Sequence, residues 1–218
     1  MKIVTWNCAM ALDKKFEVLS ILDCDLMVIQ ECSRKSIERI NAYEGYSAVW
    51  YGENKNKGLG IVARSPWKII ESRELGLKWI LHSVVTGPIK VDLIGVWTHK
   101  TESRETRYIR QVLGLIDILE SSERSENIIL LGDFNSNSIW DLDYNGSGHS
   151  LAVERLSNLS LYSAYHKYFN EEHGQETRPT LYFRKRKSSA FHIDYIFLSS
   201  PLIQSLKSSS KNLLKSLP

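Results

Sequence analysis

The chain of 218 residues lacks the features that mark several specialised classes of protein. Its three cysteines, Cys8, Cys24 and Cys32, include no C-x-x-C pair, which argues against a disulfide framework and a structural zinc site. No apolar run approaches the ~20 residues that a membrane helix needs. The amino terminus reads as a strand and carries no apolar signal sequence. We therefore expect a soluble, cytoplasmic protein with reduced, buried thiols.

A strong excess of one charge is also absent, because 28 basic and 25 acidic residues leave a formal net charge of +3. Composition alone therefore predicts no strong electrostatic field for a polyanion. The length lies at the upper end of a single domain, and no internal repeat or linker divides the chain. Residues 199–218 form a Ser/Lys-rich tail without Asp, Glu or His. We expect one domain over residues 1–198, followed by this atypical tail.

The most informative segment is 127–135, which reads N-I-I-L-L-G-D-F-N. Its continuous apolar run is typical of a strand that is buried on both faces. Gly132 permits a sharp turn, and Asp133 and Asn135 then place polar side chains at the exit of the strand, where sites are commonly built. The same residues are frequent in turns, so the motif alone fits a turn or a site about equally.

The remaining sequence predicts a mixed α/β protein. Apolar residues at helical spacing predict four helices, which span residues 12–22, 33–42, 103–121 and 151–159. Between residues 46 and 98, strands follow one another with short turns, which indicates an antiparallel meander. The predicted strands span 2–6, 25–30, 46–51, 58–63, 68–73, 78–85, 89–98, 128–131, 178–183 and 191–198. The polar segment 136–150 is predicted as a loop, and the aromatic segment 162–169 fits no single element.

Polar side chains recur at or near the ends of the predicted strands. They are Asn7, Glu31, His99, Asp133, Asn135 and, inside the last strand, Asp194. Strands that lie side by side would bring these groups into one cleft. Carboxylate and amide oxygens without clustered Cys or His indicate a hard cation, Mg²⁺ or Mn²⁺. The set therefore favours metal-assisted phosphoryl chemistry, although each residue taken singly also fits a turn, a strand boundary or a satisfied core histidine.

The order of these motifs resembles the endonuclease/exonuclease/phosphatase superfamily, which includes pancreatic deoxyribonuclease, apurinic-site endonucleases and inositol polyphosphate 5-phosphatases. The motifs run from residue 2 to about residue 198, and K-G-L-G at 57–60 resembles a Gly-containing strand of the family. Each motif is short, and the specificity lies in their order. They are W-N at 6–7, I-Q-E at 29–31, T-H at 98–99, G-D-F-N at 132–135 and H-I-D-Y-I-F at 192–197.

The resemblance implies a four-layer α/β/β/α sandwich of two packed mixed sheets with the site at one edge. Glu31 would be the principal ligand of Mg²⁺ or Mn²⁺, and Asn7 would assist. Asp133 would orient or deprotonate the attacking water. Asn135 would hold a phosphate oxygen, and His99 would contact the phosphate.

One departure from the family pattern lies at the carboxyl end. Relatives finish with S-D-H and an apolar strand, and Asp194 would orient that histidine, but nothing after Asp194 matches here. Ala9 also stands where some members carry Asp. Loss of one transition-state donor typically lowers the rate by about 10²–10³, so the resemblance implies impaired catalysis. It also implies that the last strand is missing and leaves a neighbouring strand with an open edge.

Three further residues are candidates for the site. His192 is two residues from Asp194 and would share its face of a strand, as a supporting group or a phosphate contact. Arg184 and Arg186 belong to a basic run after two aromatic residues, which can contact a phosphate backbone. A solvated hairpin tip explains that run equally well.

These residues predict a Mg²⁺-dependent phosphodiesterase of nuclease type that acts by in-line attack of water on DNA, RNA or another phosphate ester. A phosphomonoesterase acting on a small or lipid phosphate is the alternative among enzymes. A non-catalytic relative that binds nucleic acid or another phosphorylated partner is the alternative outside enzymes.

Overall fold

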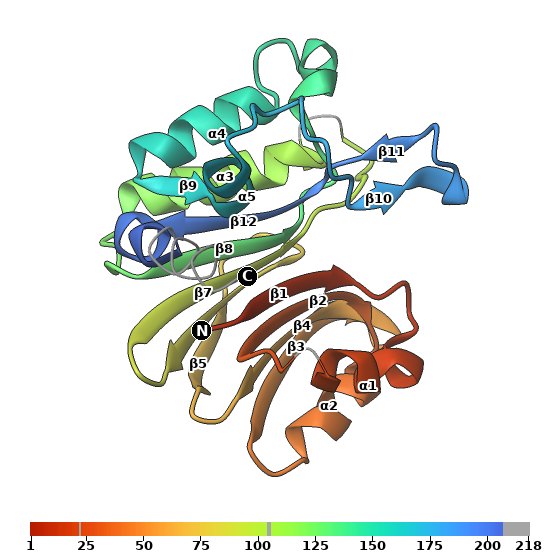
Figure 1. Ribbon diagram of the computed structural model, residues 1–218, viewed down its shortest axis with the longest axis vertical. Helices are drawn as coiled ribbons and strands as arrows, with labels where there is room; N and C mark the ends of the chain where they lie inside the picture. The colour runs from red at the N-terminus through yellow and green to blue at the C-terminus, as the bar shows by residue number, and fades with distance from the viewer. Residues whose placement is uncertain (22, 104–105, 207–218) are drawn as a thin grey trace, which may run out of the picture.

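The computed structural model describes residues 1–21, 23–103 and 106–206, and it consists of two sheets packed face to face between layers of helix (Figure 1). The four-layer sandwich expected from the sequence is confirmed. The first sheet has the order β1-β2-β4-β3. Its first pair is parallel and the other pairs are antiparallel. These strands are β1 (Ile3–Asn7), β2 (Leu26–Cys32), β3 (Tyr46–Asn54) and β4 (Lys57–Arg64).

The second sheet has the order β5-β6-β7-β8-β12-β9 and is antiparallel except for the pair β7 and β8. A separate hairpin of β10 and β11 projects from the body of the molecule (Figure 1). The strands are β5 (Lys68–Glu74), β6 (Ile80–Thr86), β7 (Lys90–Trp97), β8 (Ile128–Asp133), β9 (Leu161–Ser163), β10 (Leu181–Tyr182), β11 (Ala190–Phe191) and β12 (Asp194–Ser199).

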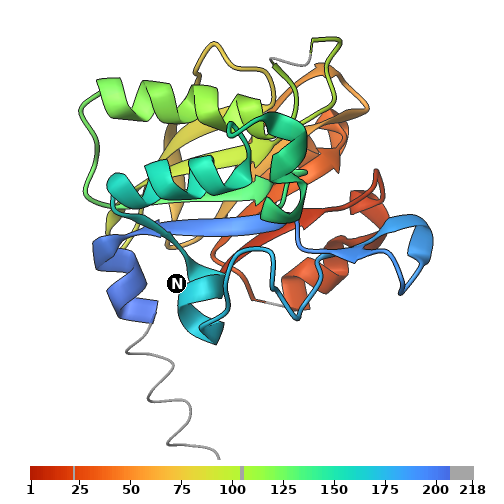
Figure 2. The same cartoon turned by 90° about the horizontal axis from the view of Figure 1, so that it is seen from above.

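Helices cover the outer face of each sheet. The helices α1 (Leu12–Ile21) and α2 (Arg34–Asn41) lie on the first sheet. Figure 2 shows α3 (Ile109–Ser121) and α4 (His149–Asn158) side by side over the second sheet. Shorter elements in the described part of the chain include α5 (Ala164–Phe169) and the 3₁₀ turns η2 (Ser138–Tyr144) and η3 (Phe183–Lys185). In the part of the chain that the structure describes, no helix has the length and hydrophobicity to cross a membrane.

Apolar side chains from both sheets form a continuous core between them. Leu59 and Ile61 of β4 pack in one cluster with Leu93 of β7 and Ile129 of β8. All six residues of β8 are buried, which confirms the prediction from its unbroken apolar run. Cys8, Cys24 and Cys32 are buried in a second cluster beneath α1 and α2.

Several predicted elements have different bounds in the structure. The longest helix begins at Ile109 and not at Ser103. The amide of Gln111 donates to the carbonyl oxygens of Thr106 (2.8 Å) and His99 (3.0 Å), and residues 104–105 of the predicted helix lie outside the described residues. The strand predicted over 178–183 is restricted to β10, and the polar loop 136–150 contains η2 and the start of α4. By contrast, Ser33 caps α2 as predicted, because its hydroxyl accepts from the backbone N–H of Ser36.

Two features concern the carboxyl end of the chain. Among the described residues β1 pairs with β2 alone, so β1 is one edge strand of its sheet and β3 is the other. The predicted tail begins within β12, and residues 200–206 are helical. Leu202 and Ile203 of this helix pack into the core between the sheets. The rest of the tail, 207–218, lies outside the described residues, and the division at residue 198 stays a prediction.

Candidate active site

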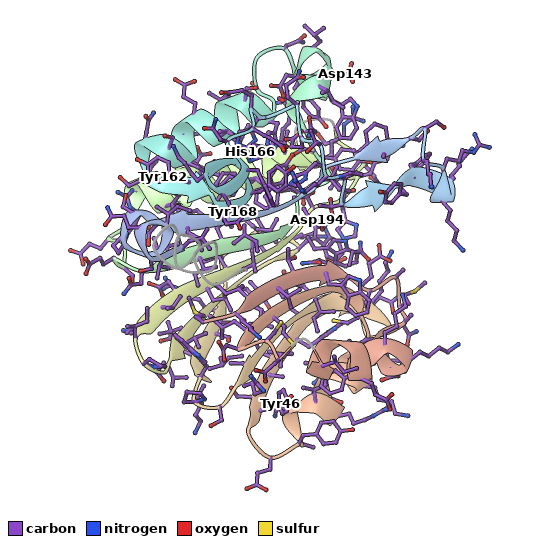
Figure 3. The ribbon with its side chains drawn as sticks, viewed as in Figure 1. Tyr46, Asp143, Tyr162, His166, Tyr168 and Asp194 are labelled. Atoms are coloured by element: carbon purple, nitrogen blue, oxygen red, sulfur yellow. The ribbon has the colours of Figure 1, made fainter. Side chains whose placement is uncertain are left out.

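The ends of β1, β2 and β8 and the start of β12 meet at one edge of the sandwich. Asn7, Glu31, Asp133 and Asp194 line a single hollow of about 740 Å³ there. Asp194 is labelled in Figure 3, near the junction of the two sheets. Parallel pairing of β1 with β2 and antiparallel pairing of β12 with β8 bring these four side chains together from distant parts of the sequence.

Asn7 links the two sheets across this edge. Its side-chain Nδ2 donates to Glu31 Oε1 (3.3 Å) on one sheet and to Asp133 Oδ2 (3.0 Å) on the other. The backbone N–H of Ala9 donates to Asn7 Oδ1 (3.1 Å) and fixes the orientation of the amide. The asparagine predicted to assist the metal therefore holds the two carboxylates at a set separation.

The side chains of Glu31 and Asn135 are oriented by backbone in an unfavourable conformation. Glu31 has φ 58° and Asn135 has φ 45°, a region that costs about 1–3 kcal/mol for residues other than glycine. Glu31 lies where the register of β2 against β4 shifts between Gln30 and Cys32, and bulges of this kind redirect side chains beside active sites. At Asn135, the backbone N–H donates to Asp133 Oδ1 and the side-chain Nδ2 donates to the carbonyl of Thr98, both at 3.0 Å.

Asp133, which is buried, and Asp194, which is half-buried, form a pair of like groups. They are direct cross-strand partners, and Asp133 is 3% exposed. Burial raises the pKa of Asp133 to about 6, although the hydrogen bonds from Asn7 and Asn135 oppose this shift. Burial and the neighbouring Asp133 raise the pKa of Asp194 to about 7. The pair therefore retains a proton near neutral pH unless a cation stabilises the charged forms.

The donor set fits a hard divalent cation. Asp194 Oδ1 is buried without a hydrogen-bond partner among the described residues, and the carboxylates of Glu31 and Asp133 line the same hollow. Oxygen donors of this kind suit Mg²⁺ or Mn²⁺. The Nζ of Lys57 lies 3.3 Å from Glu31 Oε1 and supplies a positive charge to the site.

His99 does not line this hollow but a separate one, together with Trp79 and Lys100, and its ring packs against two indole rings. Its ring centroid is 3.7 Å from that of Trp97 and 4.4 Å from that of Trp79. Burial, together with the charge of Lys57, lowers the pKa of His99 to about 4, and the charge of Glu31 opposes this. Its Nε2 is buried without a partner among the described residues. At pH 7 the imidazole is thus neutral and retains one uncommitted nitrogen.

The three remaining candidates lie in different surroundings. His192 precedes β12 and lines the hollow with Asp194. Its Nδ1 is 2.9 Å from the carbonyl oxygen of Arg178, and its ring packs on Tyr165 at 4.4 Å. Arg184 and Arg186 are exposed at the tip of the projecting hairpin (Figure 1), and neither lines the hollow at Asp133.

Two features of the site were missed from the sequence. Lys57 was noted only as part of a glycine-containing motif, and its approach to Glu31 depends on the register of β4 against β2. The hollow is also lined by aromatic rings from β1 and α5, namely Trp6, Tyr165, Tyr168 and Phe169. Three of these come from the aromatic segment 162–169 that matched no single element. The aromatic composition of this segment was the one sequence feature that could have indicated its place in the site.

Comparisons with known proteins agree with this architecture. The model of the Endonuclease/Exonuclease/phosphatase family matches residues 4–210, whereas no curated protein matches the chain. The 3'-5' exonuclease NExo of Neisseria meningitidis is 19% identical, with a TM-score of 0.68 over 94% of this chain and 89% of that one. An AP endonuclease from Archaeoglobus fulgidus is 18% identical, with a TM-score of 0.66 over 94% and 89%. D. rerio TDP2 complexed with single-strand DNA product is 17% identical, with a TM-score of 0.66 over 91% and 83%.

Proposed function

This chain belongs to the endonuclease/exonuclease/phosphatase family, and from that premise we propose that it is a Mg²⁺- or Mn²⁺-dependent phosphodiesterase that hydrolyses nucleic acid. The observation that carries the proposal is the group of carboxylates at the sheet edge. Asp133 and Asp194 face each other across two strands, and Asn7 ties Asp133 to Glu31. Apart from chemistry or cation binding, no benefit of burying so many acids together is evident.

Glu31 and Asn7 are proposed to hold the cation, which would neutralise phosphate charge and polarise the phosphorus centre. Asp133 accepts a proton from the attacking water, and its pKa of about 6 suits a general base that works near neutral pH. Asn135 and neutral His99 donate hydrogen bonds to phosphate oxygens. Asp194 retains a proton next to Asp133, and this avoids a second negative charge beside the ionised Asp133 carboxylate.

The walls of the hollow support a nucleic-acid substrate. Tyr165, Tyr168 and Phe169 line the hollow together with the carboxylates, and stacking on aromatic side chains is a common way to bind single-stranded bases. Lys57 lies at the carboxylates, and Arg178 stacks over Phe169 at 3.9 Å. A relative of the same fold is known as a complex with single-strand DNA product. The proposed substrate is therefore a single-stranded end or a frayed duplex.

Among the described ion pairs, Lys57 is the cation that contacts the carboxylate edge, through Glu31, and it can supply positive charge beside the phosphate.

The proposal is tested by incubating the protein with Mg²⁺ or Mn²⁺ and a panel of substrates. The panel contains plasmid DNA, a single-stranded oligonucleotide, RNA, a 3'-phosphorylated oligonucleotide and a small phosphomonoester. Asp133→Asn keeps the size of the side chain but removes the base, so cleavage of the single strand should fall by at least about 10²-fold. Asp143→Asn, on the surface turn η2 (Figure 3), is the matched control and should keep full activity.

The other outcomes separate the alternatives. Release of phosphate from the small ester alone indicates a phosphomonoesterase. Binding of the oligonucleotide without cleavage by folded wild-type protein indicates a non-catalytic relative. Cleavage that persists in Asp133→Asn contradicts the proposed role of Asp133.

A further inference from the structure

A second group of metal-binding side chains lies away from the carboxylates, where α5 and the loop after it cover the six-stranded sheet. His166 of α5, His173 and Glu176 each offer a ligand atom, and these atoms lie within 4.8 Å of one another. His166 is labelled in Figure 3. None of the three takes part in the proposed hydrolysis, so this cluster calls for a separate explanation.

Each of these side chains is held in place by a further group. His166 Nε2 lies 3.1 Å from Glu176 Oε1, and its Nδ1 lies 2.7 Å from the hydroxyl of Ser163. Glu176 Oε2 accepts from Asn137 Nδ2 (3.0 Å) and from the backbone N–H of Gly174 (3.1 Å). Supporting hydrogen bonds of this kind orient ligands in protein metal sites.

A third imidazole supports His173. The Nε2 of His149 lies 3.3 Å from His173 Nδ1, and the Nδ1 of His149 lies 2.9 Å from the hydroxyl of Ser136. The ring of His173 stacks on that of His166, with centroids 3.5 Å apart and planes at 17°.

The charge balance favours a cation over a hydrogen-bonded network alone. The side chain of Glu176 is 3% exposed, and among the ion pairs of the described residues its partner is His166. Burying an ionised carboxylate without a full countercharge is costly. A divalent cation neutralises the carboxylate and uses the lone pairs of neutral imidazoles.

We propose that His166, His173 and Glu176 bind a Zn²⁺ ion that fastens the loop 170–180 to α5 and the sheet. Two imidazoles and one carboxylate are a ligand set typical of zinc, with water in the fourth position. His166 and His173 line a surface hollow of about 340 Å³, which gives the ion a route of entry. The cysteine spacing opposes a zinc site built from thiolates, whereas these ligands follow the spacing H-x₆-H-x₂-E.

The ion would act on the active site through the loop that it holds. The carbonyl of Arg178 contacts His192, and the hydroxyl of Thr180 is hydrogen-bonded to the backbone of Ile193 and Asp194. Zinc binding therefore stabilises the fold and the position of Asp194 without contacting the substrate.

The test is calorimetric titration of the chelator-treated full-length protein with Zn²⁺, combined with thermal unfolding. We expect one equivalent to bind and to raise the midpoint of unfolding. His173→Gln and Glu176→Gln should each weaken binding by more than about tenfold, because removal of even a supporting partner weakens metal sites by about 10–100-fold. Glu172→Gln changes an exposed acid of the same hollow and should bind as the wild type does.

Two controls make the result decisive. Co²⁺ in place of Zn²⁺ should give a spectrum without a thiolate charge-transfer band, which excludes Cys8, Cys24 and Cys32 as ligands. Glu31→Gln should retain zinc binding, because Glu31 belongs to the carboxylate edge. Absence of binding to the wild type, or binding unchanged in both ligand variants, overturns the proposal. Loss of zinc in Glu31→Gln also overturns it, since the ion would then lie at the other site.

Discussion

At the scale of single residues, the opposed carboxyls of Asp133 and Asp194 connect chemistry with stability. Both groups have pKa values raised well above the ordinary value of 3.8, mainly by burial. The folded state therefore binds protons more tightly than the unfolded state. In the absence of metal, the pair reduces stability as the pH rises from about 4 through 7, and the loss persists above that range.

We predict that Asp194→Asn raises the thermal midpoint of the metal-free protein at pH 8 by about 5 °C or more, because an amide removes a buried charge. At pH 5 both carboxyls of the wild type are largely protonated, so the difference should shrink. Histidine titrations affect both proteins alike and cancel in the comparison. Thermal unfolding in chelator at the two pH values measures the effect. An equal difference at both would contradict it.

Lys57 competes with a cation for Glu31, since its Nζ lies 3.3 Å from Glu31 Oε1. We predict that Lys57→Met binds Mg²⁺ several-fold more tightly, because partly exposed ion pairs contribute up to about 1 kcal/mol. Hydrolysis should nevertheless slow, because the variant loses a cation beside the phosphate. Lys55→Met, an exposed lysine on the same turn, is the matched control. Weaker Mg²⁺ binding by Lys57→Met would rule out the competition.

At the scale of elements, Gly132 determines how β8 delivers Asp133 to the site. Its φ is 152°, and a Cβ at this position would collide with the backbone carbonyl of Val96 on β7. We predict that Gly132→Ala lowers the free energy of unfolding by more than about 3 kcal/mol, because the close strand pair cannot relax. Gly114→Ala, on α3 with ordinary space for a methyl group, should be neutral or stabilising by up to about 1 kcal/mol. Urea unfolding of both variants makes the comparison.

The elements themselves were largely predictable because they depend on local patterns. The unbroken apolar run identified β8, and turn residues marked the meander from β3 to β7. The start of α3 was wrong because Gln111 holds the preceding loop through its side chain, an interaction that spacing does not reveal. The strand predicted over 178–183 was too long for a similar reason, since Thr180 and Arg178 hydrogen-bond to residues beside β12.

For the candidate site too, some features were predictable from the sequence and others were not. The chain order of the motifs placed Asn7, Glu31 and Asp133 at strand ends, and the structure brings these side chains together. The direct opposition of Asp194 to Asp133 depends on strand register, and the left-handed backbone of Glu31 depends on a bulge. Such features arise from tertiary contacts, which no local pattern encodes. The ligands of the His166 cluster lie close together in the sequence, and the prediction overlooked their spacing, whereas the contacts of Asn137 and His149 with them come from distant segments.

At the scale of the whole molecule, the two sheets share one core. Ile61 of the first sheet and Leu93 of the second are fully buried in the same cluster. We predict a single cooperative unfolding transition. Ile61→Ala and Leu93→Ala should each destabilise the whole protein by about 2–5 kcal/mol. Scanning calorimetry, compared with the van't Hoff enthalpy, tests this. Two separate transitions, each sensitive to one variant, would show that the sheets unfold independently.

The open edge of β1 makes one side of the active site accessible to hydrogen–deuterium exchange. Asn7 ends a strand that has one neighbour among the described residues. Amides of β1 that face away from β2 have no strand partner there, so they should exchange quickly, while the intervening amides bonded to β2 remain protected. A ligand that binds Asn7 would first slow the exchange of those quickly exchanging β1 amides. Deuterium uptake over residues 3–7 can therefore report occupancy of the site even in a variant that no longer turns over substrate.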